Sequence, residues 1–263
     1  MNLTRKRILV TASTKGIGRG VARALLKKGA KVLLSSRSAE NVSAAVRELR
    51  TISDTVWGFP ADLTDLNSLE VLVEEAQRAM GGVDVLVMNS GNPEREPATF
   101  TETTMEDWEY AVKLYLLSSV KLVKLLYPQM VERRWGRVIF LSSYTVKEPQ
   151  EIFSLADVSR APLMQLCKVL ARELGKYGLT FNVVLMGSFR TPGALRTISR
   201  LAQRRGEDTE EVWKREVESV IPAGRVGDIE GDLGELVAFL ASDSSAYING
   251  SYITIDGGLT RAL

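Results

Sequence analysis

The segment VTASTKGIG, residues 10–18, decides the fold of this 263-residue chain. An apolar run ends at its first residue, and a segment of helical period begins near Ile17. Glycine lets a backbone approach a pyrophosphate closely, and the free N–H groups of the following helix attract an anion. The generic dinucleotide fingerprint would need glycine at position 21, where Val21 stands, so that fingerprint is not met.

Outward from this turn, short β-branched apolar runs alternate with longer segments of helical period, which is typical of βαβ units. We expect strands at 7–12, 31–36, 55–59, 83–88, 137–141, 179–185 and 252–255. The pattern predicts a single α/β Rossmann-fold domain over residues 1–263, with a doubly wound parallel sheet of about seven strands and helices on both faces. A polar helical pair at about 191–225 is expected to be a lid-like insertion or, equally, a solvated surface helix.

Composition excludes several classes of function. Lys and Arg total 34 against 32 Asp and Glu, which is too balanced to predict nucleic acid or an acidic membrane as partner. The opening residues lack the apolar region of a signal peptide, and no apolar run is long enough to span a bilayer, so we expect a cytoplasmic location. The single Cys167 cannot form an internal disulfide.

The chain contains no histidine. This removes the commonest general base and the commonest zinc ligand, so no metal site is expected. Any acid or base must therefore be Tyr, Lys, Asp, Glu or a hydroxyl that relays protons.

The glycine turn resembles the Thr-Gly-x-x-x-Gly-x-Gly turn of the short-chain dehydrogenase/reductase family. Thr11, Gly16 and Gly18 match it, and Ala12 replaces the first glycine. The resemblance runs nearly end to end, through ADL at 61–63, NSG at 89–91, FLSS at 140–143, TFNVVLMGSFRT at 180–191 and the tail at 237–258. It implies a Rossmann fold, a nicotinamide cofactor, and an activity similar to that of 3-oxoacyl reductases and sugar dehydrogenases.

Carried over by position, the resemblance implies a set of cofactor-binding residues. Asp62 and Leu63 would contact adenine, and Gly187 and Thr191 belong to the segment that closes over the nicotinamide. The whole set is Thr11, Ser13, Lys15, Gly16, Ile17, Gly18, Arg37, Asp62, Leu63, Asn89, Gly91, Arg160, Gly187 and Thr191.

Charge predicts which cofactor binds. An NAD-specific site has an acid about 20 residues after the glycine turn, where it would repel a 2′-phosphate. Here Arg37 occupies that neighbourhood and Lys15 lies in the turn, so two cations can converge on one phosphate. We therefore expect NADP(H), with NAD(H) the less favoured alternative. The alternative of solvated surface cations stays open, more for Lys15 than for Arg37.

The family's proton relay consists of an asparagine, a serine, a tyrosine and a lysine. Ser143 matches the serine, but Ala156 stands at the tyrosine position, Arg160 at the lysine position and Lys113 at the asparagine position. Arg160 can donate to ribose hydroxyls, but it cannot exchange protons because its guanidinium stays charged. The catalytic candidates are therefore Ser143, Lys113 and Arg160, in a degenerate tetrad.

A substitute acid is needed in place of the tyrosine. Burial beside Arg160 would push the pKa of Lys113 toward the working pH, so we rank Lys113 above Lys147 and Tyr144. Pro162 predicts a helix that begins near Ser159, because proline is tolerated in a first turn but not in a helix interior. Residues 153–158 would then form a separate turn.

Two classes of function remain. The first is an NADP(H)-dependent oxidoreductase acting on a carbonyl or secondary alcohol of a small 3-oxoacyl-like or sugar-like molecule. The alternative is a catalytically inactive nucleotide-binding sensor or subunit partner. The long apolar segments 108–130 and 163–174 match helices that pack across a two-fold axis in the resembled family, so we expect a homotetramer, with a dimer as the second choice.

Overall fold

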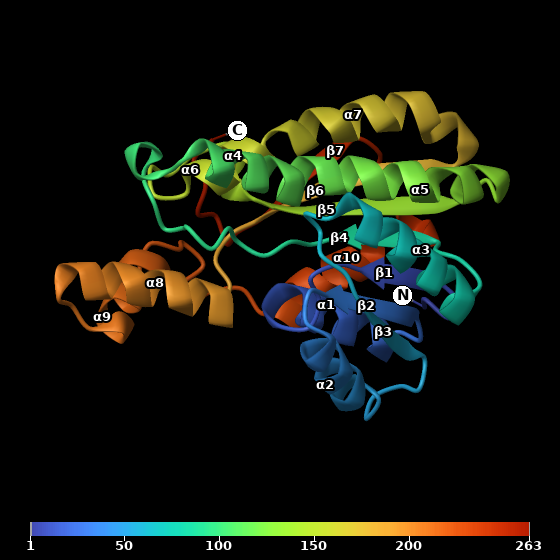
Figure 1. Cartoon of the computed structure of the whole chain (residues 1–263), viewed down its shortest axis with the longest axis horizontal. Coiled ribbons are helices and arrows are strands. Elements are labelled where there is room, and N and C mark those ends of the chain that lie inside the picture. The colour runs from blue at the N-terminus through green and yellow to red at the C-terminus, as the bar shows by residue number, and fades with distance from the viewer. Residues whose placement is uncertain (1, 263) are drawn as a thin grey trace.

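The computed structural model describes residues 2–262, which form one seven-stranded parallel sheet in the order β3-β2-β1-β4-β5-β6-β7 (Figure 1). The strands are β1 (Arg7–Val10), β2 (Lys31–Ser36), β3 (Val56–Pro60), β4 (Val85–Met88), β5 (Gly136–Ser143), β6 (Leu179–Met186) and β7 (Ser251–Ile255). Every predicted strand boundary lies within two residues of the observed one. The predicted doubly wound Rossmann sheet is confirmed.

Helices cover both faces of the sheet. One face carries α1 (Gly16–Lys27), α2 (Ala39–Leu49) and α10 (Glu235–Leu240), and the other carries α3 (Leu66–Met80), α4 (Met105–Val112), α5 (Ser118–Glu132) and α7 (Pro162–Leu174) (Figure 1). Alternate strand residues enter the two cores: Leu9 packs with α3 and α5, whereas Ile8 and Val10 pack with α1. Because both faces are covered, the strands are continuous apolar runs.

The segment between β6 and α10 contains the α-helices α8 (Pro192–Arg205) and α9 (Thr209–Trp213) and two π-helical stretches, Lys214–Glu218 and Ile229–Gly234. Figure 1 shows α8 and α9 projecting to one side of the sheet. Their buried apolar side chains form a third cluster, separate from the two cores of the sheet, that includes Ile198, Leu201 and Trp213. Helices with a small apolar cluster of their own therefore lie within the predicted range, and their description as a lid-like insertion stays a prediction.

The prediction from Pro162 is wrong. Helix α6 (Ser154–Arg160) already covers the segment expected to be a turn, and α7 begins directly at Pro162. Ala161, at φ −54° and ψ −39°, keeps right-handed helical geometry between the two helices. The missing N–H of proline falls at this junction, where it removes one hydrogen bond without breaking either helix.

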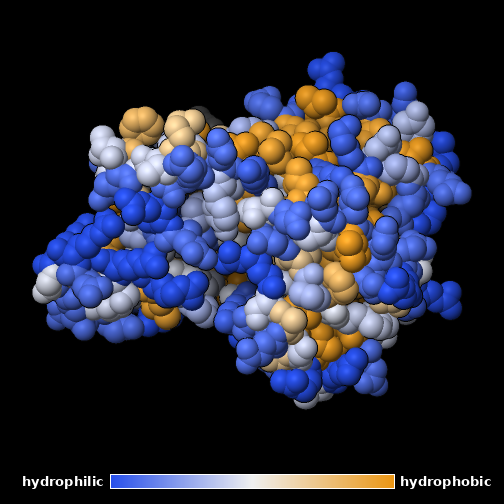
Figure 2. All heavy atoms as spheres, in the orientation of Figure 1, coloured by the Kyte–Doolittle hydropathy of each residue, from blue (hydrophilic) through white to orange (hydrophobic). Residues whose placement is uncertain are grey.

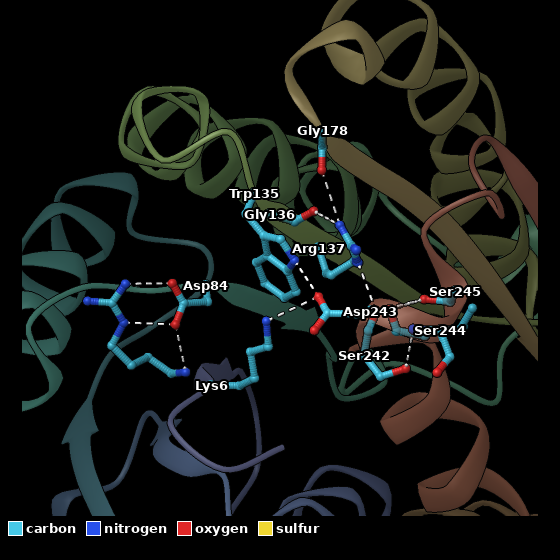
Figure 3. A network of polar contacts seen from close by, with 12 residues as sticks. Lys6, Asp84, Trp135, Gly136, Arg137, Gly178, Ser242, Asp243, Ser244 and Ser245 are labelled. Atoms are coloured by element: carbon cyan, nitrogen blue, oxygen red, sulfur yellow. Dashed lines mark hydrogen bonds and ion pairs between the residues drawn. The ribbon is translucent and has the colours of Figure 1, made fainter. Parts of the chain in front are cut away.

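A polar network lies at the amino-terminal ends of the strands, around Trp135, which directly precedes β5 (Figure 3). Lys6 and Arg137 both lie over its indole ring, with Lys6 Nζ 3.4 Å and Arg137 Cζ 4.3 Å from the ring centroid. The indole N–H donates to Asp243 at 2.7 Å. The buried Arg137 also donates to three backbone carbonyls, those of Gly136, Gly178 and Ser242. This network ties the start of β5 to the chain that follows α10.

Asp84 joins the starts of β1 and β4. Arg7 donates to it from the backbone at 3.0 Å and from its guanidinium at 2.8 and 2.5 Å. Burial alone would raise the pKa of Asp84, but the hydrogen bonds and charge of Arg7 outweigh burial and hold the pKa below its ordinary value.

We predict that Asp84→Asn lowers the free energy of unfolding by about 2 kcal/mol at pH 7, because it weakens charge-assisted hydrogen bonds. A lowered pKa in the folded state gives stability that is present above the ordinary Asp pKa of about 4 and lost as the pH falls through the folded value. The difference from wild type should therefore shrink at pH 3. Urea unfolding at both pH values tests this, with exposed Asp54→Asn as the control. An equal loss at both pH values would contradict it.

Candidate cofactor and active site

The candidate site lies at the carboxyl ends of the strands, beginning with the glycine turn between β1 and α1. No side chain within residues 2–262 caps the N-terminus of α1, and its first turn holds no acidic residue. Gly16 has φ +53°, and a Cβ at Gly18 would lie 2.6 Å from the Ala12 carbonyl oxygen and 2.7 Å from Asn89 Nδ2. The turn thus requires glycine and leaves helical N–H groups available to an anion.

Thr11, Ser13 and Asn89 hold the turn in place. Thr11 Oγ1 donates to the Asn89 carbonyl at 2.5 Å and accepts the Asn89 N–H at 3.0 Å. Asn89 Nδ2 donates to the Ala12 carbonyl at 2.9 Å. Ser13 Oγ donates to the Val10 carbonyl at 2.6 Å and is fully buried. The hydroxyls of Thr11 and Ser13 are therefore occupied within the turn.

The residues predicted to bind the adenosine half of the cofactor lie in the loops that follow β2 and β3, and Glu94 from the loop after β4 approaches them. The Arg37 guanidinium reaches Glu94 Oε1, on the loop after β4, at 3.1 Å. The hydrogen bond to Glu94 is the main reason that the pKa of Arg37 is raised. Asp62 accepts hydrogen bonds from Thr64, and Leu63 is buried. Lys15 is exposed on the glycine turn.

The chain after β6 folds back onto the glycine turn. Thr191 caps α8 by accepting the Ala194 N–H at 3.0 Å. Its side chain lies beside Gly16, since a Cβ there would be 3.4 Å from Thr191 Cβ. Gly187 lies so close to β7 that an added Cβ would be 2.6 Å from Asp256 Cα. The structure thus brings together Gly16 and Thr191, which are far apart in sequence.

Ser143, at the end of β5, begins a buried chain of polar groups. Its Oγ lies 2.8 Å from Thr145 Oγ1, and Thr145 in turn hydrogen-bonds to Asp157 Oδ1. The other Asp157 oxygen accepts the Gln150 N–H at 3.0 Å. Burial is the largest influence on Asp157 and raises its pKa.

Arg160 faces the interior of the site. Its Nε donates to the Ala156 carbonyl at 3.1 Å, its Nη2 lies 3.4 Å from Asp157 Oδ1, and its Cζ lies 5.2 Å from the centroid of the Tyr115 ring. Tyr115 is buried, and its hydroxyl donates to the Gly91 carbonyl at 3.0 Å. The predicted contact of Arg160 with ribose stays a prediction.

Lys113 is the first residue of a π-helical segment, Lys113–Leu117, between α4 and α5, and it is exposed, so the burial expected for it is not observed. Arg160 contacts Asp157 and Tyr115, and Tyr115 lies two residues after Lys113 in the sequence. The residue of this segment that lies against Arg160 is therefore Tyr115, whereas the sequence spacing pointed to Lys113. The role of Lys113 as an acid stays a prediction.

Glu96 is a site residue that sequence reasoning missed. It is 3% exposed, and one carboxylate oxygen accepts the Ala156 N–H at 2.7 Å. Its other oxygen is buried and has no hydrogen-bond partner within residues 2–262. Burial raises the pKa of Glu96 to about 7. The acid lies between Arg95 and Pro97 in an irregular loop, where no periodicity signals burial.

Membrane-spanning helices and groups of side chains that could ligate a metal ion would indicate other classes of protein. Among residues 2–262, no helix is both long enough and apolar enough to cross a membrane. The same part of the chain has no group of three or more Cys, Asp or Glu side chains arranged to ligate a metal ion.

Comparisons with known proteins extend over nearly the whole chain. A family model described as enoyl-(acyl carrier protein) reductase matches residues 11–260. Oxidoreductase UcpA of Salmonella typhimurium is 32% identical over 261 residues, covering 98% of this chain and 95% of the relative. The 3-oxoacyl-(acyl-carrier-protein) reductase FabG of Haemophilus influenzae is 32% identical over 254 residues, covering 95% and 96%.

Solved structures agree with this likeness. A variant of actinorhodin polyketide ketoreductase, crystallised with NADPH, is similar with a TM-score of 0.92 at 28% identity, covering 99% of this chain and 100% of that one. L-sorbose reductase from Gluconobacter frateurii, complexed with NADPH and L-sorbose, has the same TM-score of 0.92 and the same identity of 28%, covering 100% and 99%.

Ala12 gives a prediction about the glycine turn. Its φ of +44° lies in the left-handed region, which a Cβ atom disfavours by about 1–2 kcal/mol. Ala12→Gly should therefore raise the free energy of unfolding by about 0.5–1 kcal/mol, after the greater backbone entropy of glycine in the unfolded chain is subtracted. Exposed Ala44, within α2, is the matched control, because Ala44→Gly should lower stability by about 1 kcal/mol. Loss of stability in both variants would contradict the strain at Ala12.

Proposed function

The chain belongs to the short-chain dehydrogenase/reductase family, and we propose that it is an NADP(H)-dependent oxidoreductase that interconverts a carbonyl group and a secondary alcohol. The observation that carries this proposal is the glycine turn before α1. Its helix N-terminus is uncapped, and Gly18 leaves room for hydrogen alone. That combination suits the pyrophosphate of a dinucleotide.

The other predicted cofactor residues fit the rest of such a molecule. Arg37 is the cation available to a 2′-phosphate at the end of β2, and Thr191 lies against the glycine turn where the nicotinamide half would extend. When bound, the cofactor supplies or accepts the hydride. The protein's part is to orient the cofactor, to bind the substrate oxygen and to provide or remove a proton.

Ser143 is the residue that we place against the substrate oxygen. Its hydroxyl ends the polar chain at the carboxyl edge of β5, on the same edge as the glycine turn. Lys113 remains a candidate acid and Arg160 a candidate contact to ribose. With Ala156 in place of the family's tyrosine, proton transfer must take another route than the usual one.

The names of two similar proteins support the proposed substrate class. FabG is named for a 3-oxoacyl substrate and L-sorbose reductase for a sugar, so we propose a small molecule of one of these two kinds. The α8–α9 insertion, residues 191–225, would act as the lid over it. We also propose a cytoplasmic location.

A homotetramer is proposed for the assembly, with a dimer as the second choice. Figure 2 shows hydrophobic side chains gathered over the side of the molecule formed by α5 and α7. Tyr127 and Val169 are exposed large hydrophobic residues on these helices. An apolar helix face of this kind fits contact with a second copy of the chain.

Turnover tests the proposed function directly. We expect oxidation of NADPH in the presence of a ketone, aldehyde, 3-oxoacyl thioester or keto sugar, at a rate about 10²–10⁴-fold below that of an enzyme with a fully positioned acid. Absorbance of the reduced nicotinamide measures it. Tight NADPH binding with no turnover on any of these substrates would instead favour the nucleotide-binding sensor or subunit partner, which the residues Ala156 and Arg160 suggest.

Cofactor preference gives a second test. Arg37→Ala should weaken NADPH binding by about tenfold or more and leave NADH binding nearly unchanged, because charge-assisted hydrogen bonds contribute about 1.5–3 kcal/mol. Glu94→Gln should tighten NADPH binding, since the Glu94 carboxylate competes for the same guanidinium. Calorimetry with both cofactors measures these changes, and Arg50→Ala, an exposed arginine at the end of α2, is the control. Equal affinity of the wild type for NADH and NADPH would contradict the preference.

A further inference from the structure

The Ser143, Thr145 and Asp157 side chains form a continuous hydrogen-bonded chain. Thr145 and Asp157 are 4% and 2% exposed, whereas Ser143 is only partly buried. The chain therefore runs from the candidate substrate position into the protein interior and ends on a carboxyl group.

The direction of these hydrogen bonds depends on Asp157. Thr145 has one hydroxyl hydrogen and cannot donate to both neighbours. If Asp157 is ionised, it only accepts, so Thr145 donates to Asp157 and Ser143 donates to Thr145. If Asp157 is protonated, every bond reverses, and the Ser143 hydrogen is free to point toward the substrate.

We propose that Asp157 is the proton store of this site, acting on the substrate oxygen through Thr145 and Ser143 in place of the absent tyrosine. This inference rests on the proposed function. Only Ser143 would touch the substrate, so Thr145 and Asp157 are positioning residues that determine which way its hydrogen points.

The two directions of the chain correspond to the two directions of reaction. In reduction, the bound cofactor would supply the hydride to the carbonyl carbon, and as the C=O π bond breaks, the carbonyl oxygen takes the Ser143 proton. Ser143 then takes the proton of Thr145, and Thr145 takes that of Asp157, which becomes a carboxylate. After product release, water returns one proton through Ser143. Oxidation of an alcohol follows the same steps in reverse, starting from ionised Asp157.

Several charged or titratable groups face Asp157. Arg160 lies one turn along the same helix, Glu96 comes from the loop after β4, Tyr115 from the π-helical segment and Tyr144 from the turn after β5. Arg160 and the hydrogen bonds from Gln150 and Thr145 favour the carboxylate, while burial outweighs them and raises the pKa. Glu96 is the closest competitor, because its carboxyl is also buried and its pKa is raised to about 7.

A purely structural role for Asp157 makes different predictions. Asp157 also holds the Gln150 N–H and the Arg160 guanidinium, so its replacement could alter the site without any proton transfer. A structural role would change rate at all pH values alike. If Asp157 stores the proton, the rate of reduction instead falls and the rate of oxidation rises as the pH increases through the pKa of Asp157.

The first experiment measures kcat against pH in both directions with NADP(H) and the best substrate found by screening. Asp157→Asn should remove the pH-dependent limb and lower kcat at least about tenfold, with KM for NADPH within about twofold of wild type. Thr145→Val should do the same, and Thr145→Ser should restore both rate and limb because it keeps the hydroxyl. Melting temperatures of all variants check that they are folded.

Two matched variants identify the competing acids. The limb should persist in Glu96→Gln and in Lys113→Met. If it disappears in either of these and survives in Asp157→Asn, that residue carries the proton and our assignment is overturned. Failure of Thr145→Ser to restore activity that Thr145→Val has lost would also overturn it.

A second measurement needs no turnover, so it separates this inference from the proposed function. Infrared difference spectra of protein with isotope-labelled aspartate follow the protonation of Asp157, and Asp157→Asn identifies its band. Thr145→Val should raise the midpoint of this titration, because it removes a hydrogen bond to the carboxylate, while Thr145→Ser should leave it in place. An unchanged midpoint in Thr145→Val would overturn the coupling, even in a protein that proves to be active.

Discussion

Two hydrogen bonds between Thr11 and Asn89 join the carboxyl ends of β1 and β4. The other residues of the candidate site are arranged around this junction, which we call the β1–β4 seam. β1 and β4 are the neighbours at which the sheet order changes direction, since the chain adds β2 and β3 on one side and β5 to β7 on the other. In such sheets, ligands bind in the crevice at this switch point. Gly18 keeps the seam narrow, because any side chain there would strike Asn89.

Much of the fold was predictable from the sequence because both sheet faces are covered, so strands are short apolar runs and helices are amphipathic. The glycine turn was predictable because its constraint is local. The start of the helix around Ala156 was not, since it depends on Glu96, whose carboxylate accepts a first-turn N–H from sixty residues away along the sequence. The position of Arg160 likewise depends on Asp157 and on the distant Tyr115.

At Ala156 and Arg160, where we propose that the family's tyrosine and lysine are replaced, the surrounding charges are unequal. Two buried carboxyl groups, of Glu96 and Asp157, share one neighbouring guanidinium, that of Arg160. Full ionisation of both acids would leave an uncompensated negative charge in the interior, so burial favours retention of a proton on one of them. A lysine at position 160 could have released its own proton, whereas arginine cannot.

The apolar cluster of α8 and α9 is separate from the two cores of the sheet, so α8 and α9 can open locally without the sheet unfolding. Trp213 and its neighbours bury their surface against one another rather than against the sheet. Transient opening of this unit would therefore expose only a small apolar area, and the two large cores would stay closed. Amide protons in α8 and α9 should consequently exchange with solvent by local openings, at a lower free energy than global unfolding, while the sheet remains fully folded.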